Sequence, residues 1–496
     1  MSLKDVCEQI VDELQTTYRP QGLGKLRKLK GDRLQCLRLS VSSLIADSLP
    51  LIMGRTSSHR YASIHKRSNH YAGGRYDPSQ TYKIHVVTAY EGMVWLGYLQ
   101  EEKVGVSLRA QGKYLTRYSA TRKLLRLFGD IDVELLPVLI PSKRLEEPLI
   151  VKIKREEIDE RGKRFKISER LDYTDTPTTE QMRSNLHLIN NNLERHWIDI
   201  GLKDSELHEV RRQLAQDTAR HDEYLETLNL GKRCLHRSFL NTEFTSGGRF
   251  YGGWWQIIPK LFRSHILIDD KKTVELDYSG LHPAFLYAQE GHQVPEDPYD
   301  VGLSSDHRDI VKRAFNAMLN AEKELKRAPQ KLKISQTGIT WKELSNRLSE
   351  LHRPIQHHFY TGVGNYLQFR DSQIAELIML RFIKEKAGAV VLPVHDSFIV
   401  HHGYETELHD MMIEEFQRLY GQEINLGKLT QKYMSLTDRP EEGWPSLDLD
   451  ELLRLSDIGC IRRFEKFQSI SRVASKLDET VPQHANSSYF GSQSSI

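Results

Sequence analysis

The sequence predicts an α+β fold with more than one domain, and three observations support this class. At 496 residues the chain is longer than one average domain, so we expect two or three domains. Two short apolar runs, 274–277 and 392–400, are rich in β-branched and aromatic residues and are typical of buried strands. Segments with helical periodicity, at 306–320 and 368–384, lie between these strands, as expected where helices pack on a sheet.

The composition narrows the class of protein without identifying it. Charged residues make up 28% of the chain, but the net charge is only +3, so no global basic field indicates nucleic acid. A single basic cluster would be an ordinary solvated face, whereas several together indicate a divided surface that could follow a phosphate backbone. The basic clusters lie at 25–30, 152–155, 161–166 and 323–333.

The cysteines and the hydropathy pattern indicate a cellular compartment. The four cysteines form no CxxC pair, which argues against a disulfide framework or a zinc site and fits a reducing compartment. No apolar run approaches 18 residues, and the N-terminus lacks the apolar segment of a signal peptide. We therefore expect a soluble, cytoplasmic protein without a membrane partner.

We expect four regions along the chain. The first is an N-terminal α+β region, the second a helical, thumb-like connector, the third a region that carries the candidate site, and the fourth a C-terminal helical segment with a disordered tail rich in Ser, Gln and Asn. Their boundaries are 1–150, 151–230, 231–440 and 441–496.

The N-terminal region resembles a winged helix. Helices are predicted near the start, at 37–53 and at 86–99, and a Gly-turned strand pair at 104–109 and 113–118 carries basic side chains. In the winged-helix family a helix enters the major groove while the hairpin contacts the DNA backbone. The alternative is a small α+β domain that binds protein or only packs.

Strand-like runs at 133–140 and 149–154 lead into the connector, which contains two amphipathic helices at 178–199 and 205–228. These helices are either a hairpin packed on a core or an arm that grips a duplex.

Two aspartates give the central chemical hypothesis. Asp277 ends the first strand-like run, and Asp396 lies in the polar turn of the hairpin formed by 392–400. Held on adjacent strands, the two carboxylates could share two Mg²⁺ ions, which clamp the attacking and leaving oxygens of a phosphoryl displacement. Mg²⁺ keeps several waters, so two carboxylates and substrate phosphates suffice.

Two further segments carry candidate binding groups. On the helix predicted at 306–320, Arg308, Lys312, Asn316 and Asn320 lie along one stripe, where two cations and two amides could contact a triphosphate and a base or sugar. The alternative is a solvated basic stripe, which would explain the cations but less readily the amides. Upstream, Arg249 follows a Gly turn, which allows close approach of a phosphate or base edge.

Four motifs in one order resemble the family A nucleic-acid polymerases, which include bacterial DNA polymerase I and the phage-type single-subunit RNA polymerases. The motifs are Thr-x-x-Gly-Arg at 245–249, Asp-Tyr-Ser at 277–279, Arg-x-x-x-Lys at 308–312 and His-Asp-Ser at 395–397. The resemblance spans residues 230–425 and implies a right-hand polymerase. Its palm would be an antiparallel sheet, with helical fingers and a helical thumb.

The resemblance implies the roles of the site residues. Asp277 and Asp396 would bind the metal ions, with Mn²⁺ as an alternative to Mg²⁺. Arg308 and Lys312 would contact the incoming triphosphate, and a lysine placed there can protonate the leaving pyrophosphate. Tyr278 would also contact the substrate.

The template side of the site is implied in the same way. Arg249 is similar to a motif arginine near the primer-template minor groove, and Gln368 takes the place of a polar contact to the primer-template. His395 flanks the metal aspartate on the nucleic-acid side.

At two positions this sequence departs from the family pattern, and both positions bear on how the incoming nucleotide is selected. Asn320 stands where the fingers helix usually ends with a tyrosine that helps to hold the templating base. His282 stands where the DNA polymerases carry Glu and the RNA polymerases a small residue, and its bulk would crowd a 2′-hydroxyl. The short spacing from Asp277 to Arg308 implies reduced fingers, and no upstream exonuclease motifs are present.

These residues predict a template-directed nucleotidyltransferase, with DNA synthesis favoured over RNA synthesis. The expected partners are a primer-template, nucleoside triphosphates and proteins of replication or of a mobile element. Three alternatives stay open: an RNA polymerase or primase-like enzyme, a non-catalytic DNA-binding replication-initiation protein, and a nuclease. A nuclease would need more acidic companions, of which only Glu275 shares the strand face of Asp277.

Overall fold

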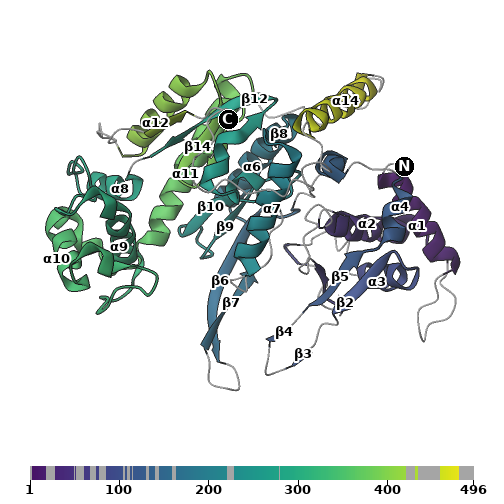
Figure 1. Ribbon diagram of the computed structural model, residues 1–496, viewed down its shortest axis with the longest axis horizontal. Coiled ribbons are helices and arrows are strands. Elements are labelled where there is room, and N and C mark those ends of the chain that lie inside the picture. Colours follow the sequence, from purple (N-terminus) through teal and green to yellow (C-terminus); the bar gives the residue numbers. More distant parts are fainter. Residues whose placement is uncertain are drawn as a thin grey trace, which may run out of the picture.

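The structure is a computed structural model. It describes residues 3–17, 28–49, 51, 61–66, 74–76, 85–103, 107–108, 112–113, 115–129, 133–139, 145–158, 164–219, 228–278, 280–420, 430–433 and 459–479. Figure 1 shows an N-terminal unit at one end, a helical lobe containing α8, α9 and α10 at the other, and the main sheets between them. The predicted α+β class is confirmed, with antiparallel pairing throughout the sheet that carries Asp277.

The N-terminal unit has its own apolar core, and its three-stranded sheet has the order β1-β5-β2. The predicted helix at 86–99 ends at Trp95, because Gly97 adopts a φ of +77° and turns the chain into the next strand. Part of the predicted strand pair, including Arg109, lies outside the described residues. The elements of this unit are α1 (Leu3–Thr17), α2 (Gly31–Ser48), β1 (Ala62–Ile64), α3 (Val86–Trp95), β2 (Leu99–Lys103), β3 (Ser107–Leu108), β4 (Gly112–Lys113), β5 (Thr116–Ala120) and α4 (Arg122–Leu127).

The prediction of a strand at 133–140 is wrong. The described part of this segment forms a 3₁₀ turn, η3 (Val133–Leu135), and a short helix, α5 (Leu136–Leu139). Pro137 is the second residue of α5, where its missing N–H is not needed, whereas the same residue would interrupt a strand ladder.

Two sheets form the centre of the molecule. A four-stranded sheet has the order β10-β9-β6-β7, in which β6 and β9 run parallel. A larger sheet has the order β13-β14-β12-β11-β8, and β15 also pairs with β12. The strands are β6 (Leu149–Ile158), β7 (Arg164–Leu171), β8 (Ile198–Ile200), β9 (His236–Phe239), β10 (Gly247–Tyr251), β11 (Ile266–Ile268), β12 (Lys271–Asp277), β13 (Leu392–Val394), β14 (Ser397–His401) and β15 (Thr430–Tyr433).

Long helices pack on these sheets. Both helices predicted in the connector are present. Asn185 of α6 donates to Glu376 of α11 (3.0 Å), and Asn192 of α6 donates to the Gly388 carbonyl oxygen just after α11 (2.8 Å). The inner face of α6 is buried, so α6 is part of the body of the protein and not a projecting arm. The helices are α6 (Pro177–Arg195), α7 (Asp204–Ala219), α11 (Gly364–Glu385), α12 (Glu405–Tyr420) and α14 (Gly459–Glu479).

The lobe between β12 and α11 consists of helices and 3₁₀ turns (Figure 1). The predicted helix at 306–320 is confirmed as α9, and its apolar side is buried in the same core as the main sheet. The elements are α8 (Leu281–Gln289), η6 (Ser305–His307), α9 (Arg308–Asn320), η7 (Ile334–Thr337), α10 (Trp341–Leu351) and η8 (Arg353–His358), while η4 (Trp254–Gln256) and η5 (Lys260–His265) precede β11.

A buried ion network joins three distant parts of the chain. Arg463 of α14 is fully buried and donates to both oxygens of Asp199 in β8, at 2.8 to 3.2 Å. Arg463 also pairs with Glu134 of η3, which accepts a second ion pair from Arg211 of α7. Such a buried network needs all of its members, because a lost partner leaves an uncompensated charge.

Within the described residues, no helix combines the length and the apolar character that crossing a membrane requires.

Arg237 fastens α11 to the strands beneath it. Its side chain is fully buried and donates to the Gly248 carbonyl oxygen (2.8 Å), to Ser372 Oγ (2.9 Å) and to Glu376 Oε2 (2.7 Å). All three contacts tie β9 to β10 or to α11, so this one guanidinium sets the position of the helix.

We expect Arg237→Met to lower the free energy of unfolding by about 3–5 kcal/mol, because the mostly buried Glu376 carboxylate, 12% exposed, then keeps its charge without its partner. Urea unfolding followed by tryptophan fluorescence measures the change. The matched control is Lys386→Gln, which removes a 3.5 Å pair with Glu407 at the surface and should cost less than about 1 kcal/mol. Equal losses in both variants would contradict a special role for Arg237.

His352 gives the lobe a pH-dependent stability. It is fully buried, with Nε2 2.8 Å from the Pro298 carbonyl oxygen and Nδ1 3.2 Å from the Tyr287 hydroxyl. Burial lowers its pKa to about 4, so the unfolded chain binds a proton more readily than the folded one. Stability is therefore complete above the unfolded pKa of roughly 6.5 and falls as the pH drops toward 4, by up to about 1.4 kcal/mol per unit.

We expect His352→Gln to flatten this decline between pH 6.5 and 4, measured as the urea midpoint at several pH values. A residual slope should remain from His236, whose pKa burial also lowers to about 4. His409→Gln, on the exposed side of α12, is the control and should leave the slope unchanged. An unchanged slope in His352→Gln would rule out His352 as the titrating group.

Candidate active site

The two aspartates of the central hypothesis lie on paired strands. In the antiparallel register of β12 with β14, Asp277 is opposite Ser397, the residue that follows Asp396. The Tyr278 N–H donates to the Asp396 carbonyl oxygen at 3.3 Å, so the end of β12 is bonded directly to the turn that carries Asp396. Both aspartates are partly exposed at this edge of an otherwise buried sheet.

The buried side chain of Glu275 supports the β13–β14 hairpin that carries Asp396. It is 2% exposed, forms an ion pair with Arg263, and accepts a hydrogen bond from Ser397 Oγ at 2.7 Å. Ser397 Oγ also lies 3.1 Å from the Val394 carbonyl oxygen across the turn. Glu275 thus holds the turn next to Asp396, and its pairing with Arg263 leaves it a buried support and not an exposed third acid.

The turn itself is strained at His395. This residue has a φ of +60°, which costs a side-chain-bearing residue on the order of 1 kcal/mol. Its ring contacts Tyr251 edge to face at 6.0 Å between centroids. Desolvation by the surrounding protein and the charge of Arg249 lower the pKa of His395.

Arg249 is held by a buried carboxylate that the sequence reasoning missed. Asp371 of α11 is 2% exposed, and Arg249 Nε lies 3.2 and 3.0 Å from its two oxygens, with a further bond from Nη2. His282 Nε2 lies 3.3 Å from the same carboxylate. The structure therefore joins two predicted site residues through Asp371, which lies three residues after the predicted Gln368, on the same helix.

Tyr299 links the helical lobe to the aspartates and was also missed. Its hydroxyl is buried, and burial raises its pKa further than the nearby Arg308 lowers it, with Asp396 and Asp277 adding to the rise. The Arg308 guanidinium lies 5.0 Å and the Lys312 ammonium 6.0 Å from the centre of its ring. Both predicted cations of α9 thus lie near the ring of Tyr299, and this tyrosine is itself within electrostatic range of both aspartates.

Arg308 also has a carboxylate partner. It forms a two-pronged ion pair with Asp297, at 2.9 and 3.1 Å. Burial opposes the charge of Asp297, but the hydrogen bonds from Arg308 lower the pKa of this carboxyl overall. The pair is 39% exposed on each side, so a ligand with phosphate oxygens could exchange with Asp297 at little cost.

The remaining predicted residues are more scattered. Asn320 donates to the Asn316 carbonyl oxygen at 2.7 Å. It also packs on Gly364 at the start of α11, where a Cβ on residue 364 would lie 2.0 Å from the Asn320 side-chain oxygen. Gln368 is one turn further along α11 and partly exposed. The Tyr278 side chain is buried and donates to the Met412 carbonyl oxygen at 2.5 Å, so it faces the core and not the aspartates.

The donor set at this edge fits hard cations. Two partly exposed carboxylates on bonded strands offer oxygen ligands and leave room for water and phosphate, as Mg²⁺ requires. Among the described residues, a cluster of three metal-ligating side chains occurs elsewhere, at Glu290, His357 and His358.

Neither a protein-family model nor a curated protein matches this sequence.

Proposed function

We propose that the chain is a template-directed nucleotidyltransferase, and that it extends a 3′-hydroxyl with deoxynucleotides and releases pyrophosphate. The observation that carries the proposal is the pairing of β12 with β14, which brings Asp277 and Asp396 to one edge of the sheet. The two cations near the Tyr299 ring belong to α9, and Asp396 and Asp277 act electrostatically on the same tyrosine. Phosphoryl transfer depends on positioning and charge neutralisation. It needs carboxylates that bind metal ions and cations that bind phosphate, held on separate rigid elements.

In this proposal Asp277 and Asp396 would hold two Mg²⁺ ions, which would neutralise charge on the reacting phosphate. Arg308 would leave Asp297 for the triphosphate, and Lys312 would stand on the same side, placed to give a proton to the leaving pyrophosphate. Asn316 and Asn320 would lie beyond them on α9. Arg249, fixed by Asp371, would face the primer-template together with His395.

Primer extension with Mg²⁺ on a labelled primer-template tests the proposal. We expect the parent chain to add deoxynucleotides and Asp277→Asn and Asp396→Asn each to lose at least about 10²-fold in rate, since several kcal/mol of charge stabilisation disappear. Asp410→Asn, an exposed carboxylate on α12, is the control and should be fully active. Circular dichroism of the variants confirms that they are folded.

Two results would contradict the proposal. Equal extension by the parent and the aspartate variants would remove the aspartates from the chemistry. No extension with deoxy- or ribonucleotides, on primed and unprimed templates alike but with duplex binding retained, would favour a DNA-binding protein. The sheet order β1-β5-β2 of the N-terminal unit, with a hairpin after α3, is compatible with that alternative.

His282 gives a separate test of sugar choice. Its ring is 20% exposed and is oriented by Asp371, so it can present fixed bulk to a ribose. We expect His282→Ala to raise the kcat/KM for ribonucleotides relative to deoxynucleotides by roughly tenfold, since removing a steric clash is worth about 1–3 kcal/mol. His282→Gln keeps most of the bulk and should keep the preference. An unchanged ratio in His282→Ala would exclude this residue as the determinant.

A further inference from the structure

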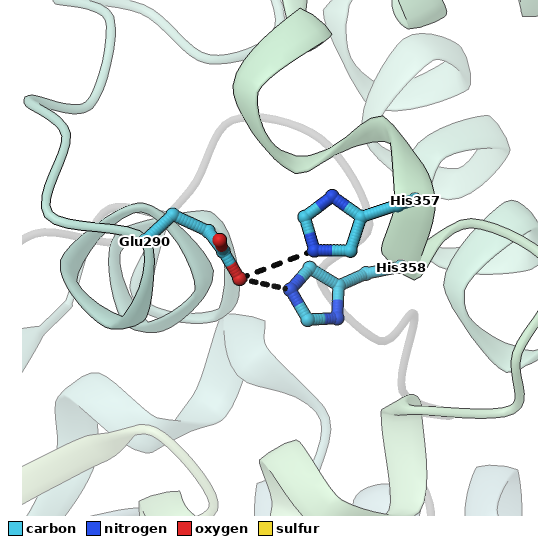
Figure 2. Close-up of side chains that lie close together, drawn as sticks. All are labelled: Glu290, His357 and His358. Carbon is cyan, nitrogen blue, oxygen red and sulfur yellow. Dashed lines mark hydrogen bonds and ion pairs between the residues drawn. The ribbon is translucent and has the colours of Figure 1, made fainter.

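Three side chains converge at the surface of the helical lobe, away from any role proposed above. Figure 2 shows the rings of His357 and His358, on η8, directed at the carboxylate of Glu290 at the end of α8. The Nε2 atoms lie 3.1 Å and 2.9 Å from the same oxygen, Glu290 Oε1. One potential ligand atom from each of the three residues lies within 4.8 Å of the other two.

The backbone holds Glu290 in place. The next residue, Gly291, adopts a φ of +70° and ends α8 with hydrogen bonds from Gly291 to Ala288 and from His292 to Tyr287. This Schellman-type ending fixes the residue that comes just before the glycine. The carboxylate is therefore presented from a rigid helix end and not from a loose loop.

The two histidines are equally constrained. Ile355, in the same 3₁₀ turn, is fully buried, and just after the turn the Tyr360 N–H donates to the Met318 carbonyl oxygen of α9 at 2.7 Å. The imidazole rings lie 4.1 Å apart between centroids, so both sit on the same side of the turn. Three ligand groups on two anchored elements lose little conformational freedom when they bind an ion.

We propose that Glu290, His357 and His358 bind one Zn²⁺ ion. Ligand atoms at 2.0–2.1 Å from a tetrahedral zinc lie about 3.3 Å from each other. The observed nitrogen-to-oxygen separations of 3.1 and 2.9 Å need to open by only a few tenths of an ångström to admit the ion. Two imidazoles and one carboxylate leave the fourth position for water.

The ligand types and the local charge favour zinc over magnesium. Imidazole nitrogens suit zinc and similar transition metals, whereas Mg²⁺ prefers an all-oxygen shell. Glu290 also lies at the C-terminal end of α8, where the helix dipole disfavours a negative charge, so a cation at this position offsets an otherwise unfavourable arrangement. The cysteine spacing had argued against a zinc site, but this cluster contains no cysteine.

The ion would clamp the helical lobe. It would connect the end of α8, a helix that begins shortly after Asp277, to the turn that precedes α11. The site does not depend on the proposed polymerase activity and can be tested without substrates.

The test is binding of Zn²⁺ to the full chain, purified metal-free, in competition with a chromophoric chelator. We expect one ion per chain, and Glu290→Gln and His357→Gln each to weaken the site by about 100-fold or more, since each removes a ligand. His357 is 56% exposed, so its substitution should leave the fold intact. Co²⁺ in place of zinc should give the strong visible absorption of a tetrahedral site with the parent chain and not with either variant.

The control is His402→Gln, which changes another surface histidine paired with a glutamate, Glu405, at 3.3 Å. It should bind zinc as the parent does. No stoichiometric binding by the parent, binding unchanged in His357→Gln, or an equal loss in His402→Gln would each overturn the proposal and leave the three residues as a hydrogen-bonded surface cluster.

Discussion

The register between β12 and β14 is the constraint on which the candidate site depends. Successive residues of a strand point to opposite faces, so a slip of one residue would send Asp277 to the other side of the sheet. The pairing is specified by burial, since Val274 and Leu276 of β12 and their partners Val400 and Phe398 are at most 2% exposed. The apolar core thereby decides where the aspartates lie, although it contains neither of them.

A second layer of constraint comes from α11. This helix is held to β9 and β10 by Arg237 and again by the pairing of Arg249 with Asp371. Each arginine is charged and mostly buried, which is costly without a partner, so the helix and the strands are bound to a single relative position. The elements that would face a nucleic acid are for this reason positioned by the same contacts that stabilise the fold.

Much of this arrangement could be predicted from local sequence. The strands at 274–277 and 392–400 and the helices at 306–320 and 368–384 follow from patterns of apolar residues, which act over short distances. The strand predicted at 133–140 failed because apolar content was given more weight than Pro137. The burial of the Tyr278 side chain was not predicted, because its neighbours in sequence do not reveal which face of the chain is buried.

The missing parts of the site are those made by long-range contacts. Asp371 meets Arg249 from 122 residues away, and Glu290 meets His358 from 68 residues away. No spacing rule reports such pairs, because they depend on how helices pack and not on a local period. Asp371 had one usable signal, an acidic residue on an otherwise apolar side of α11.

The buried network around Arg463 has a consequence for how the protein is made. Asp199 enters the sheet through β8, but the arginine that neutralises it follows 264 residues later in the chain. While the ribosome is still translating the intervening residues, this edge of the sheet holds an acid without its ion-pair partner Arg463, and burying that acid is unfavourable. The last described helix therefore acts late: Asp199 of the central sheet gains its Arg463 partner only after residue 463 has been synthesised.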